Sequence, residues 1–125
     1  MEQTRNNYKV IIAGSRTFND YDLLQKSCDD ILKAVPTDKD IIIVSGTARG
    51  ADSLGEKYAQ EHGYTIKRHP ADWKKYGKSA GMIRNAEMAK EADALICFWD
   101  GKSKGTQNMI HQARKLLLDV HLVWF

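Results

Sequence analysis

Nearly continuous apolar runs alternate with amphipathic segments along this chain, and that alternation is the feature that most constrains its fold. The runs at 8–13, 40–44 and 94–99 are typical of strands that are covered on both faces of a sheet. Shorter strands are expected at 64–68 and 120–125, the former near a sheet edge because it is more polar. Between the strands, apolar residues recur every three or four positions, as in helices that pack on a sheet.

Four helices are expected between these strands, and their ends carry ordinary helix signals. Asn19 or Asp20 can cap the first helix through its side-chain oxygen, and Pro36 marks its end. Gly63 suits the left-handed conformation that commonly ends a helix, here the second. The other two helices are expected at about 79–91 and 103–118.

Strands and helices that alternate in this way predict an α/β protein with a five-stranded parallel sheet between two layers of helices. Right-handed crossovers leave few topologies, and we expect the three-layer Rossmann-like arrangement with strand order 3-2-1-4-5. The 125 residues suit one domain, expected at 8–125 after an N-terminal tail at 1–7. In such a sheet, ligands bind beyond the carboxyl ends of the strands, where the strand order reverses.

Composition argues against several classes of protein. The 19 Lys and Arg against 16 Asp and Glu give a net charge of +3, which by itself does not predict a nucleic-acid-binding surface. The apolar runs are far shorter than the roughly 20 residues that span a bilayer, and 1–7 lacks the apolar core of a secretory signal. Cys28 and Cys97 lie in apolar surroundings, so we expect reduced thiols and a cytoplasmic protein.

The loop after the second strand, 45–52, has the composition of an anion site. Gly46 and Gly50 allow a ligand to approach the backbone closely, and the helix that follows offers free N–H groups. Arg49 can add a bidentate contact to a phosphate. The alternative is a simple glycine turn in which Asp52, in the first helical turn, stabilises the helix dipole.

The loop after the fourth strand repeats this pattern. Gly101 and Gly105 flank Ser103, and Thr106 opens the next helix. Taken alone, the segment also fits a surface loop with an ordinary helix cap. Because the two loops follow different strands of one parallel sheet, their pairing favours a shared phosphate site at its carboxyl edge.

Other polar and aromatic residues lie at the same predicted edge. Arg84 and Asn85 fall near the start of the third helix, where an arginine is often only solvated. Trp73 and Trp99 can stack on a base or pack at the rim of the core. The full set of candidate ligand-binding residues is Gly14, Ser15, Arg16, Ser45, Gly46, Thr47, Arg49, Gly50, Ala51, Asp52, Asp72, Trp73, Arg84, Asn85, Trp99, Asp100, Gly101, Ser103, Gly105 and Thr106.

Several well-known motifs are absent from the sequence. Gly14 is the only glycine after the first strand, so the loop is not the G-x-G-x-x-G loop of dinucleotide-binding proteins. A Walker A loop and a G-x-S-x-G nucleophile elbow are missing as well. The histidines His62, His69, His111 and His121 lack the spacing of metal ligands. We therefore expect no metal and no cofactor.

Four segments of the chain, taken in order, resemble the YspA-type branch of the SLOG superfamily. They are 9–16, 45–52, 80–88 and 99–106, and the resemblance extends over about 8–118. The superfamily also contains the Lonely Guy phosphoribohydrolases, formerly misnamed lysine decarboxylases, and the DNA-processing DprA proteins. This resemblance implies a Rossmann-like fold that binds nucleotides or nucleotide-derived ligands.

The Lonely Guy enzymes resemble this chain at two motifs. Their R-x-x-x-M helix is matched by Arg84 and Met88, and the Gly-Thr of their P-G-G-x-G-T-x-x-E loop by Gly105 and Thr106. Met109 stands where that loop carries the glutamate that assists cleavage of the N-glycosidic bond. A methionine cannot transfer a proton, so this departure argues against the hydrolase activity and leaves the expected ligand binding unaffected.

Three functions follow from these observations. The first is a module, such as a sensor, that binds a nucleotide or nucleotide-derived ligand through phosphate and ribose. The second is a phosphoribohydrolase that cleaves a nucleoside monophosphate to base and ribose 5-phosphate, for which the catalytic candidates are Arg84, Asp52, Asp72 and Asp100. The third is DprA-like nucleic-acid binding on a basic rim, which the small net charge does not by itself predict. The rim would comprise Lys74, Lys75, Lys78, Lys102 and Lys104.

The last predicted strand, 120–125, carries Trp124 and Phe125 and has no helix after it. Exposed apolar side chains at a sheet edge favour contact with a second copy of the chain. The alternative is that the first and last helices cover them. We therefore expect a homodimer contact at this strand.

Overall fold

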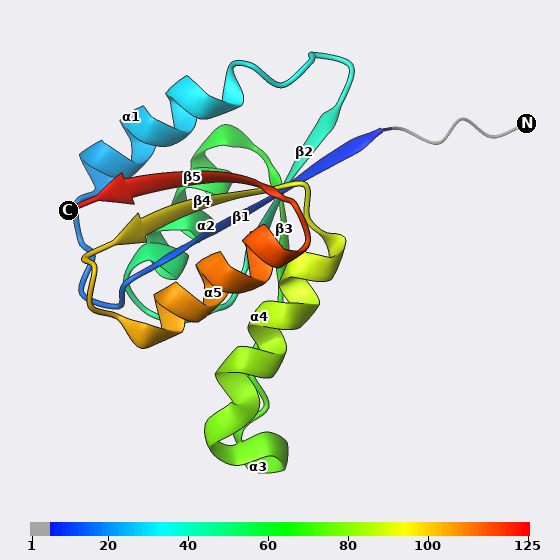
Figure 1. Cartoon of the computed structure of the whole chain (residues 1–125). Coiled ribbons are helices and arrows are strands. Elements are labelled where there is room, and N and C mark those ends of the chain that lie inside the picture. The colour runs from blue at the N-terminus through cyan, green and yellow to red at the C-terminus, as the bar shows by residue number, and fades with distance from the viewer. Residues whose placement is uncertain (1–5) are drawn as a thin grey trace, which may run out of the picture.

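A five-stranded parallel sheet forms the middle layer of the computed structural model, which describes residues 6–125 (Figure 1). The strand order is β3-β2-β1-β4-β5, which confirms the predicted topology. The edge position of β3 also agrees with its polar sequence. The strands are β1 (Asn7–Gly14), β2 (Asp40–Ser45), β3 (Thr65–Arg68), β4 (Ala94–Trp99) and β5 (Asp119–Trp124).

Four long helices form the two outer layers. One face of the sheet is covered by α1 (Tyr21–Leu32) and α2 (Ala51–His62). The opposite face is covered by α4 (Ala80–Glu91) and α5 (Lys104–Lys115). The three-layer α/β architecture predicted from the sequence is therefore confirmed.

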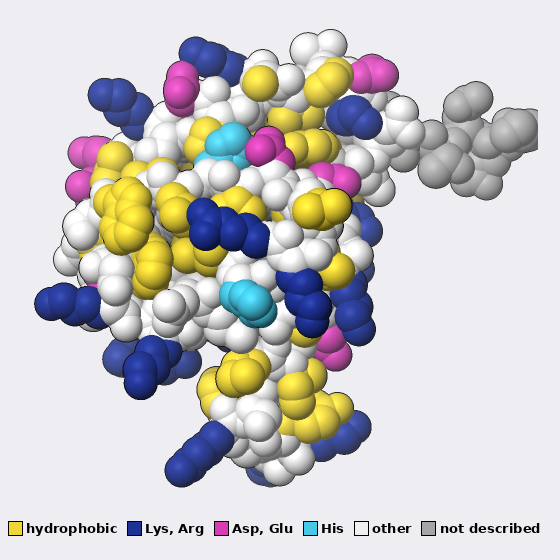
Figure 2. Space-filling model, in the orientation of Figure 1, with side chains coloured by type: hydrophobic (Ala, Val, Ile, Leu, Met, Phe, Trp, Pro, Cys, Tyr) yellow, Lys and Arg dark blue, Asp and Glu magenta, His cyan; other side chains and the backbone are white. Residues whose placement is uncertain are grey.

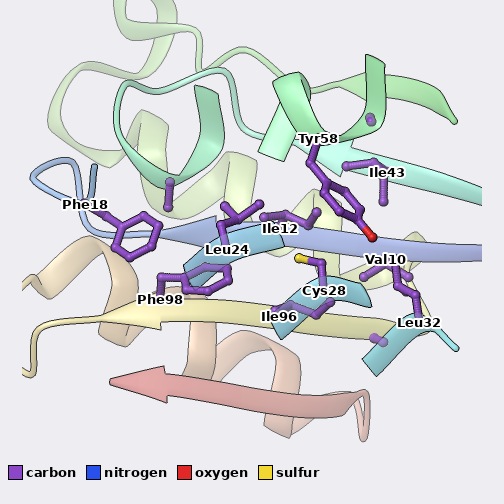
Figure 3. Packing of buried hydrophobic residues seen from close by; sticks show 13 residues of the cluster. Val10, Ile12, Phe18, Leu24, Cys28, Leu32, Ile43, Tyr58, Ile96 and Phe98 are labelled. Carbon is purple, nitrogen blue, oxygen red and sulfur yellow. The ribbon is translucent and has the colours of Figure 1, made fainter. Parts of the chain in front are cut away.

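The side chains of β1 alternate between two hydrophobic cores. Val10 and Ile12 face α1 and α2, where Figure 3 shows them near Leu24 and Tyr58. Ile11, between them, belongs to the core under α4 and α5. These three strand residues are fully buried, and burial of each contributes roughly 1.5–3 kcal/mol. The central strand reads as a continuous apolar run because both of its faces are covered.

Local signals in the sequence fix the helix ends. The Asp20 carboxylate accepts a hydrogen bond from the Leu23 N–H at 3.0 Å and caps α1. Gly63 ends α2 with a φ of 72°, the left-handed conformation expected for it. Cys28 and Cys97 are buried free thiols, and burial raises the pKa of each to about 12. The predicted core position of both cysteines is confirmed, and their reduced state stays a prediction.

A short projection before α4 was not predicted. It consists of α3 (Trp73–Tyr76) and the 3-10 turn η1 (Gly77–Ser79), and we call residues 73–79 the arm. Figure 1 shows α3 at the end of α4 that lies far from the sheet. The Asp72 carboxylate caps α3 by accepting the Lys75 N–H at 3.1 Å. A helix of four residues is too short to show a periodic pattern, so hydrophobic periodicity could not predict it.

The two ends of the chain differ from expectation in small ways. Strand β1 begins at Asn7, so one residue assigned to the tail belongs to the sheet, and the first five lie outside the described residues. At the other end, β5 is an edge strand. Trp124 is 61% exposed and its ring lies 5.2 Å from that of Trp99, whereas the Phe125 ring meets Phe18 edge-on at 4.8 Å. Contact with a second copy at this edge stays a prediction.

No helix within residues 6–125 is both long enough and apolar enough to cross a membrane.

Candidate nucleotide site

A cavity of about 540 Å³ opens at the carboxyl ends of β1 and β4, and we call it the first cavity. Its walls come from the β1–α1 loop, the arm, α4, the β4–α5 loop and the first turns of α5. The β2–α2 loop adds Ala48, and α2 adds Asp52. The structure brings many of the predicted site residues together here: Gly14, Ser15, Arg16, Asp52, Trp73, Arg84, Asn85, Asp100, Ser103, Gly105 and Thr106.

A second cavity of about 340 Å³ lies beside the first, between the β2–α2 loop and the segment that leads into the arm. Both cavities are lined by Arg16, Ala48, Trp73 and Arg84, so they share a wall. The second cavity adds three further predicted residues: Gly46, Thr47 and Arg49.

Six predicted residues lie outside the lining of both cavities: Ser45, Gly50, Ala51, Asp72, Trp99 and Gly101. Ser45 lies on the α2 side of the sheet, where its hydroxyl donates to Glu56 at 2.6 Å. The Trp99 indole N–H donates to the Ser103 carbonyl at 3.1 Å, and a Cβ on Gly101 would come within 3.2 Å of the Trp124 ring. The structure therefore gives these residues packing and capping contacts.

Two glycines allow the β1–α1 loop to pass close to its neighbours. A Cβ on Gly14 would lie 2.2 Å from the Phe98 carbonyl oxygen, which belongs to β4. Gly50 has a φ of 78°, and a Cβ there would lie 2.5 Å from the Ser15 and Arg16 carbonyl oxygens. The Ser15 N–H donates a hydrogen bond to the Phe98 carbonyl oxygen at 2.9 Å, which fixes the loop against β4. These contacts place Ser15 and Arg16 at the cavity.

Asp52 and Arg84 hold the β2–α2 loop from two sides. Asp52 is 5% exposed, and its Oδ2 accepts the Ala48 N–H at 3.2 Å. The Arg84 Nη1 donates to the Gly46 carbonyl. A Cβ on Gly46 would lie 2.8 Å from both Asp52 Oδ2 and Arg84 Nη1, so only glycine leaves room for both groups. The conformation of this loop therefore depends on a buried acid and a half-buried base.

Burial controls the ionisation of this pair. Removal from water raises the pKa of Asp52 to about 6, although the Ala48 N–H and the Arg84 charge oppose the shift. Burial also lowers the pKa of Arg84, and the Asp52 charge opposes that shift. A carboxyl group with a pKa near 6 changes charge close to physiological pH, which is uncommon outside functional sites.

Asn85 joins α4 to the start of α5. Its Oδ1 accepts the Arg84 Nε–H at 2.9 Å, which orients the guanidinium. Its amide nitrogen donates to the Asn108 Oδ1 at 3.1 Å and to the Gly105 carbonyl at 3.3 Å. Because Asn85 is buried, these contacts fix the relative positions of the arginine and the α5 N-terminus.

Asp100 shapes the β4–α5 loop. Its Oδ1 accepts the N–H groups of Lys102 at 2.8 Å and Ser103 at 3.0 Å. These two donors lower the pKa of Asp100 and keep it ionised. Ser103 then caps α5, since its hydroxyl accepts the Thr106 N–H at 3.4 Å. The Asp100 carboxylate is thus occupied in holding the loop.

The N-terminus of α5 is open toward the first cavity. Gly105 lines the cavity, and nothing lies within 4 Å of the position that a Cβ would take there. The backbone of the first turn is therefore accessible to a ligand. A helix N-terminus favours an anion, and Lys78 and Lys104 add positive charge to the same lining. This end of the cavity is suited to a phosphate group.

The cavity also has an apolar wall that the sequence analysis did not assign to the site. Met88 and Met109 are buried beneath it, and Met82 is an exposed residue at its rim. Met109 thus occupies the cavity wall at the position where the Lonely Guy motif has glutamate. Gly81 and Met88 lie four residues before and three residues after the predicted Asn85, on the same face of α4. This helical spacing was the signal that could have placed both in the lining. Other lining residues missed were Ala13, Thr17, Ala48, Lys78, Lys104 and Asn108.

Basic and apolar side chains lie together on the arm. Trp73 is 52% exposed and Tyr76 is 40% exposed. Figure 2 shows hydrophobic and basic surface side by side on this lower part of the molecule. The lysines of the predicted basic rim fall in two places. Lys74, Lys75 and Lys78 lie on the arm, whereas Lys102 lies in the β4–α5 loop and Lys104 begins α5. Within residues 6–125, no three His, Cys, Asp or Glu side chains cluster as metal ligands.

Two known proteins are similar to this chain, one in sequence and one in fold. The chain is 34% identical over 113 residues to the Gene 61 protein of Mycobacterium phage D29, a match that covers 86% of this chain and 89% of the phage protein. DNA processing protein A (DprA) from Streptococcus pneumoniae has the same fold, with a TM-score of 0.69 and 17% identity over 94% of this chain. The chain spans half the length of that DprA chain.

A family model matches the first part of the chain, which forms one side of the site. The matched residues are 8–76, which include the β1–α1 loop, the β2–α2 loop and the start of the arm. The chain therefore belongs to the YspA, cpYpsA-related SLOG family.

Proposed function

We propose that this protein binds a nucleotide or a nucleotide-derived ligand at the carboxyl edge of its sheet and acts as a sensor of that ligand. The observation that carries the proposal is the first cavity, which combines an open helix N-terminus with four basic side chains and an apolar wall. Its volume of about 540 Å³ lies within the range of small-molecule sites. The basic side chains are Arg16, Lys78, Arg84 and Lys104.

Each part of a nucleotide has a suitable counterpart in the lining. A phosphate fits the N-terminus of α5 at Gly105, because the helix dipole and the bare backbone both favour an anion there. The base fits between Met82 and Trp73, which offer polarizable and aromatic surface. The Asn108 amide is available in the same lining for ribose hydroxyls.

The test of this proposal is a substitution that fills the end of the cavity at the N-terminus of α5, where the phosphate is proposed to bind. Replacing Gly105 by leucine places a side chain in open space at the α5 N-terminus, where it would exclude a phosphate without a clash in the protein. We expect isothermal titration calorimetry to show binding of AMP or ADP-ribose by the native protein and at least about a tenfold weaker binding by Gly105→Leu, equal to 1.4 kcal/mol.

Gln107→Leu is the matched control, because Gln107 is an exposed residue of the same helix that does not line the cavity. Its affinity should stay within about twofold of the native value, since surface changes usually act weakly. Failure of the native protein to bind any member of a panel of nucleotides, NAD and ADP-ribose would refute the proposal. Equal affinities of the two leucine variants would refute this placement of the phosphate.

A second candidate function is hydrolysis of a nucleoside monophosphate to base and ribose 5-phosphate. The observation in its favour is Asp52, a buried carboxyl group in the cavity lining whose pKa is raised to about 6. Such a group is suited to general acid or base work near neutral pH. Of the other candidates, Asp72 caps α3 and Asp100 holds the β4–α5 loop.

Chromatography of AMP, GMP or CMP incubated with the protein distinguishes the two functions. Release of free base that Asp52→Asn abolishes, while the variant still binds the nucleotide, would establish the hydrolase. Binding of intact nucleotide by the native protein, with no release of base, would leave ligand binding as the function. Met109 favours the second result, because its side chain supplies no proton where the related enzymes have glutamate.

A further inference from the structure

The second cavity extends the first in one direction, toward the β2–α2 loop. The shared wall contains Arg16, Trp73 and Arg84, so a ligand seated in the first cavity would pass these side chains to enter the second. A cavity of about 540 Å³ already accommodates a nucleoside monophosphate, and the further 340 Å³ is space that such a ligand would leave empty. The second cavity therefore needs its own explanation.

The lining of the second cavity is strongly basic. Three arginines contribute to it, namely Arg16, Arg49 and Arg84, and its lining contains neither Asp nor Glu. Within the described part of the chain, Arg16 and Arg49 form no ion pair at the distances of a salt bridge. Arg16 and Arg49 thus line this hollow with no carboxylate at salt-bridge distance, and guanidinium groups so placed are suited to a phosphate, which they bind in bidentate fashion.

The backbone of this loop is already engaged, so the side chains must carry the recognition. The Thr47 N–H donates to the Ser45 hydroxyl at 3.1 Å, and the Ala48 N–H donates to Asp52 at 3.2 Å. The loop therefore differs from a phosphate-binding loop whose free N–H groups surround the anion. The first cavity offers a helix N-terminus and the second offers guanidinium groups, which makes two anion sites of different chemistry.

We infer that the two cavities together take a nucleotide with at least two phosphate groups, either a nucleoside diphosphate or a pyrophosphate ester of a nucleoside. This inference rests on the proposed function and narrows its ligand class. The two phosphates lie at the wall that the cavities share, one on the side of Arg16 and Arg84 that faces the N-terminus of α5 and the next on the side that faces Arg49. The Trp73 ring stands at the junction of the two cavities and separates the ligand from solvent there.

Arg49 is the residue that tests this inference, because it lines the second cavity alone and is exposed. The probes are AMP, ADP and ADP-ribose, each titrated calorimetrically into the native protein and into Arg49→Gln. We expect ADP and ADP-ribose to bind native protein at least about tenfold more tightly than AMP. Arg49→Gln should lose that advantage, while its affinity for AMP stays within about twofold of the native value.

Arg114→Gln serves as the matched control, since Arg114 is an exposed arginine of α5 outside both cavities. It should bind all three probes as the native protein does. Arg49→Lys keeps the charge but not the planar fork, so it should recover only part of the preference for ADP. Equal thermal unfolding of the three variants would show that each is folded.

Three results would overturn the inference, and they differ in what else they refute. Equal affinities of native protein for AMP and ADP, or an equal loss for both probes in Arg49→Gln, would remove the second anion site and leave the proposed function intact. Absence of binding for all three probes and for the wider nucleotide panel would refute the proposed function and this inference together.

Discussion

Replacing Gly14 by alanine should destabilise the protein by about 3 kcal/mol or more, because the added methyl group has no space. Its carbon would lie 2.2 Å from the Phe98 carbonyl oxygen and 2.9 Å from the Ala51 Cβ. The first contact is with the backbone of β4, which cannot move without breaking its pairing with β1. Urea unfolding followed by circular dichroism measures the loss.

Gly105→Ala is the same substitution at a site with room for the methyl group, and it should increase the free energy of unfolding. No atom lies within 4 Å of the new Cβ, and Gly105 is in the first turn of α5. Alanine in a helix reduces the freedom of the unfolded chain, so we expect a gain of about 0.4–1 kcal/mol. If Gly14→Ala were as stable as Gly105→Ala, the close packing of β1 against β4 described above would be wrong.

Asp52→Asn should remove a marked pH dependence of stability. The pKa of Asp52 is about 6 in the folded protein, whereas the ordinary value of 3.8 applies in the unfolded chain. Because folding raises this pKa, the protonated group contributes stability that is fully present below pH 3.8 and is lost as the pH rises through 6. A shift of this size corresponds to about 3 kcal/mol at 1.36 kcal/mol per unit. Asparagine does not titrate, so its variant lacks this loss.

The measurement is the free energy of unfolding of both proteins at intervals from pH 2 to pH 7. The difference between the two free energies of unfolding isolates the effect of Asp52 from that of the other titrating groups. As the pH rises, the variant should become steadily more stable relative to the native protein. Asp100→Asn provides a comparison of opposite sign. Backbone donors lower the pKa of Asp100, so its contribution is present above pH 3.8 and is lost in acid. Parallel pH curves for native protein and Asp52→Asn would show that Asp52 is not buried as described.

The order of the sheet could be predicted from the sequence because burial on both faces leaves a clear pattern. In β1 and β4 nearly every side chain contacts one of the two cores, and the apolar runs record this directly. The helix ends could also be predicted, since Asp20 and Gly63 end their helices through contacts with residues next to them in the sequence. Such features need no knowledge of distant contacts.

The individual site residues were harder to predict, because a glycine or serine in a loop has several uses. Gly14 and Gly50 were expected to admit a ligand, and their packing shows that they admit neighbouring backbone. Ser45 lies in β2 with its side chain on the α2 face, which the alternation of the strand determines but a loop motif hides. Both cavities lie at the carboxyl edge of the sheet, where the site was expected. The direction of each side chain could not be predicted, because it depends on tertiary contacts.

The arm shows the limit of periodicity as evidence. Residues 73–79 contain two short turns with exposed Trp73 and Tyr76, and neither turn is long enough to show an apolar face. Nevertheless, the arm supplies Trp73 to both cavities and Lys78 to the first. Asp72, expected as a ligand contact, was a helix cap three residues before Lys75, and that spacing was the available signal.

The placement of the tryptophans has a practical consequence for optical spectroscopy. The sequence holds three, and Trp99 and Trp124 lie together with their ring centres 5.2 Å apart, outside both cavities. Trp73 stands apart from them, half in solvent at the junction of the cavities. A chain with phenylalanine at the other two positions would emit from this single indole, and its fluorescence would follow occupancy of the site without any attached dye.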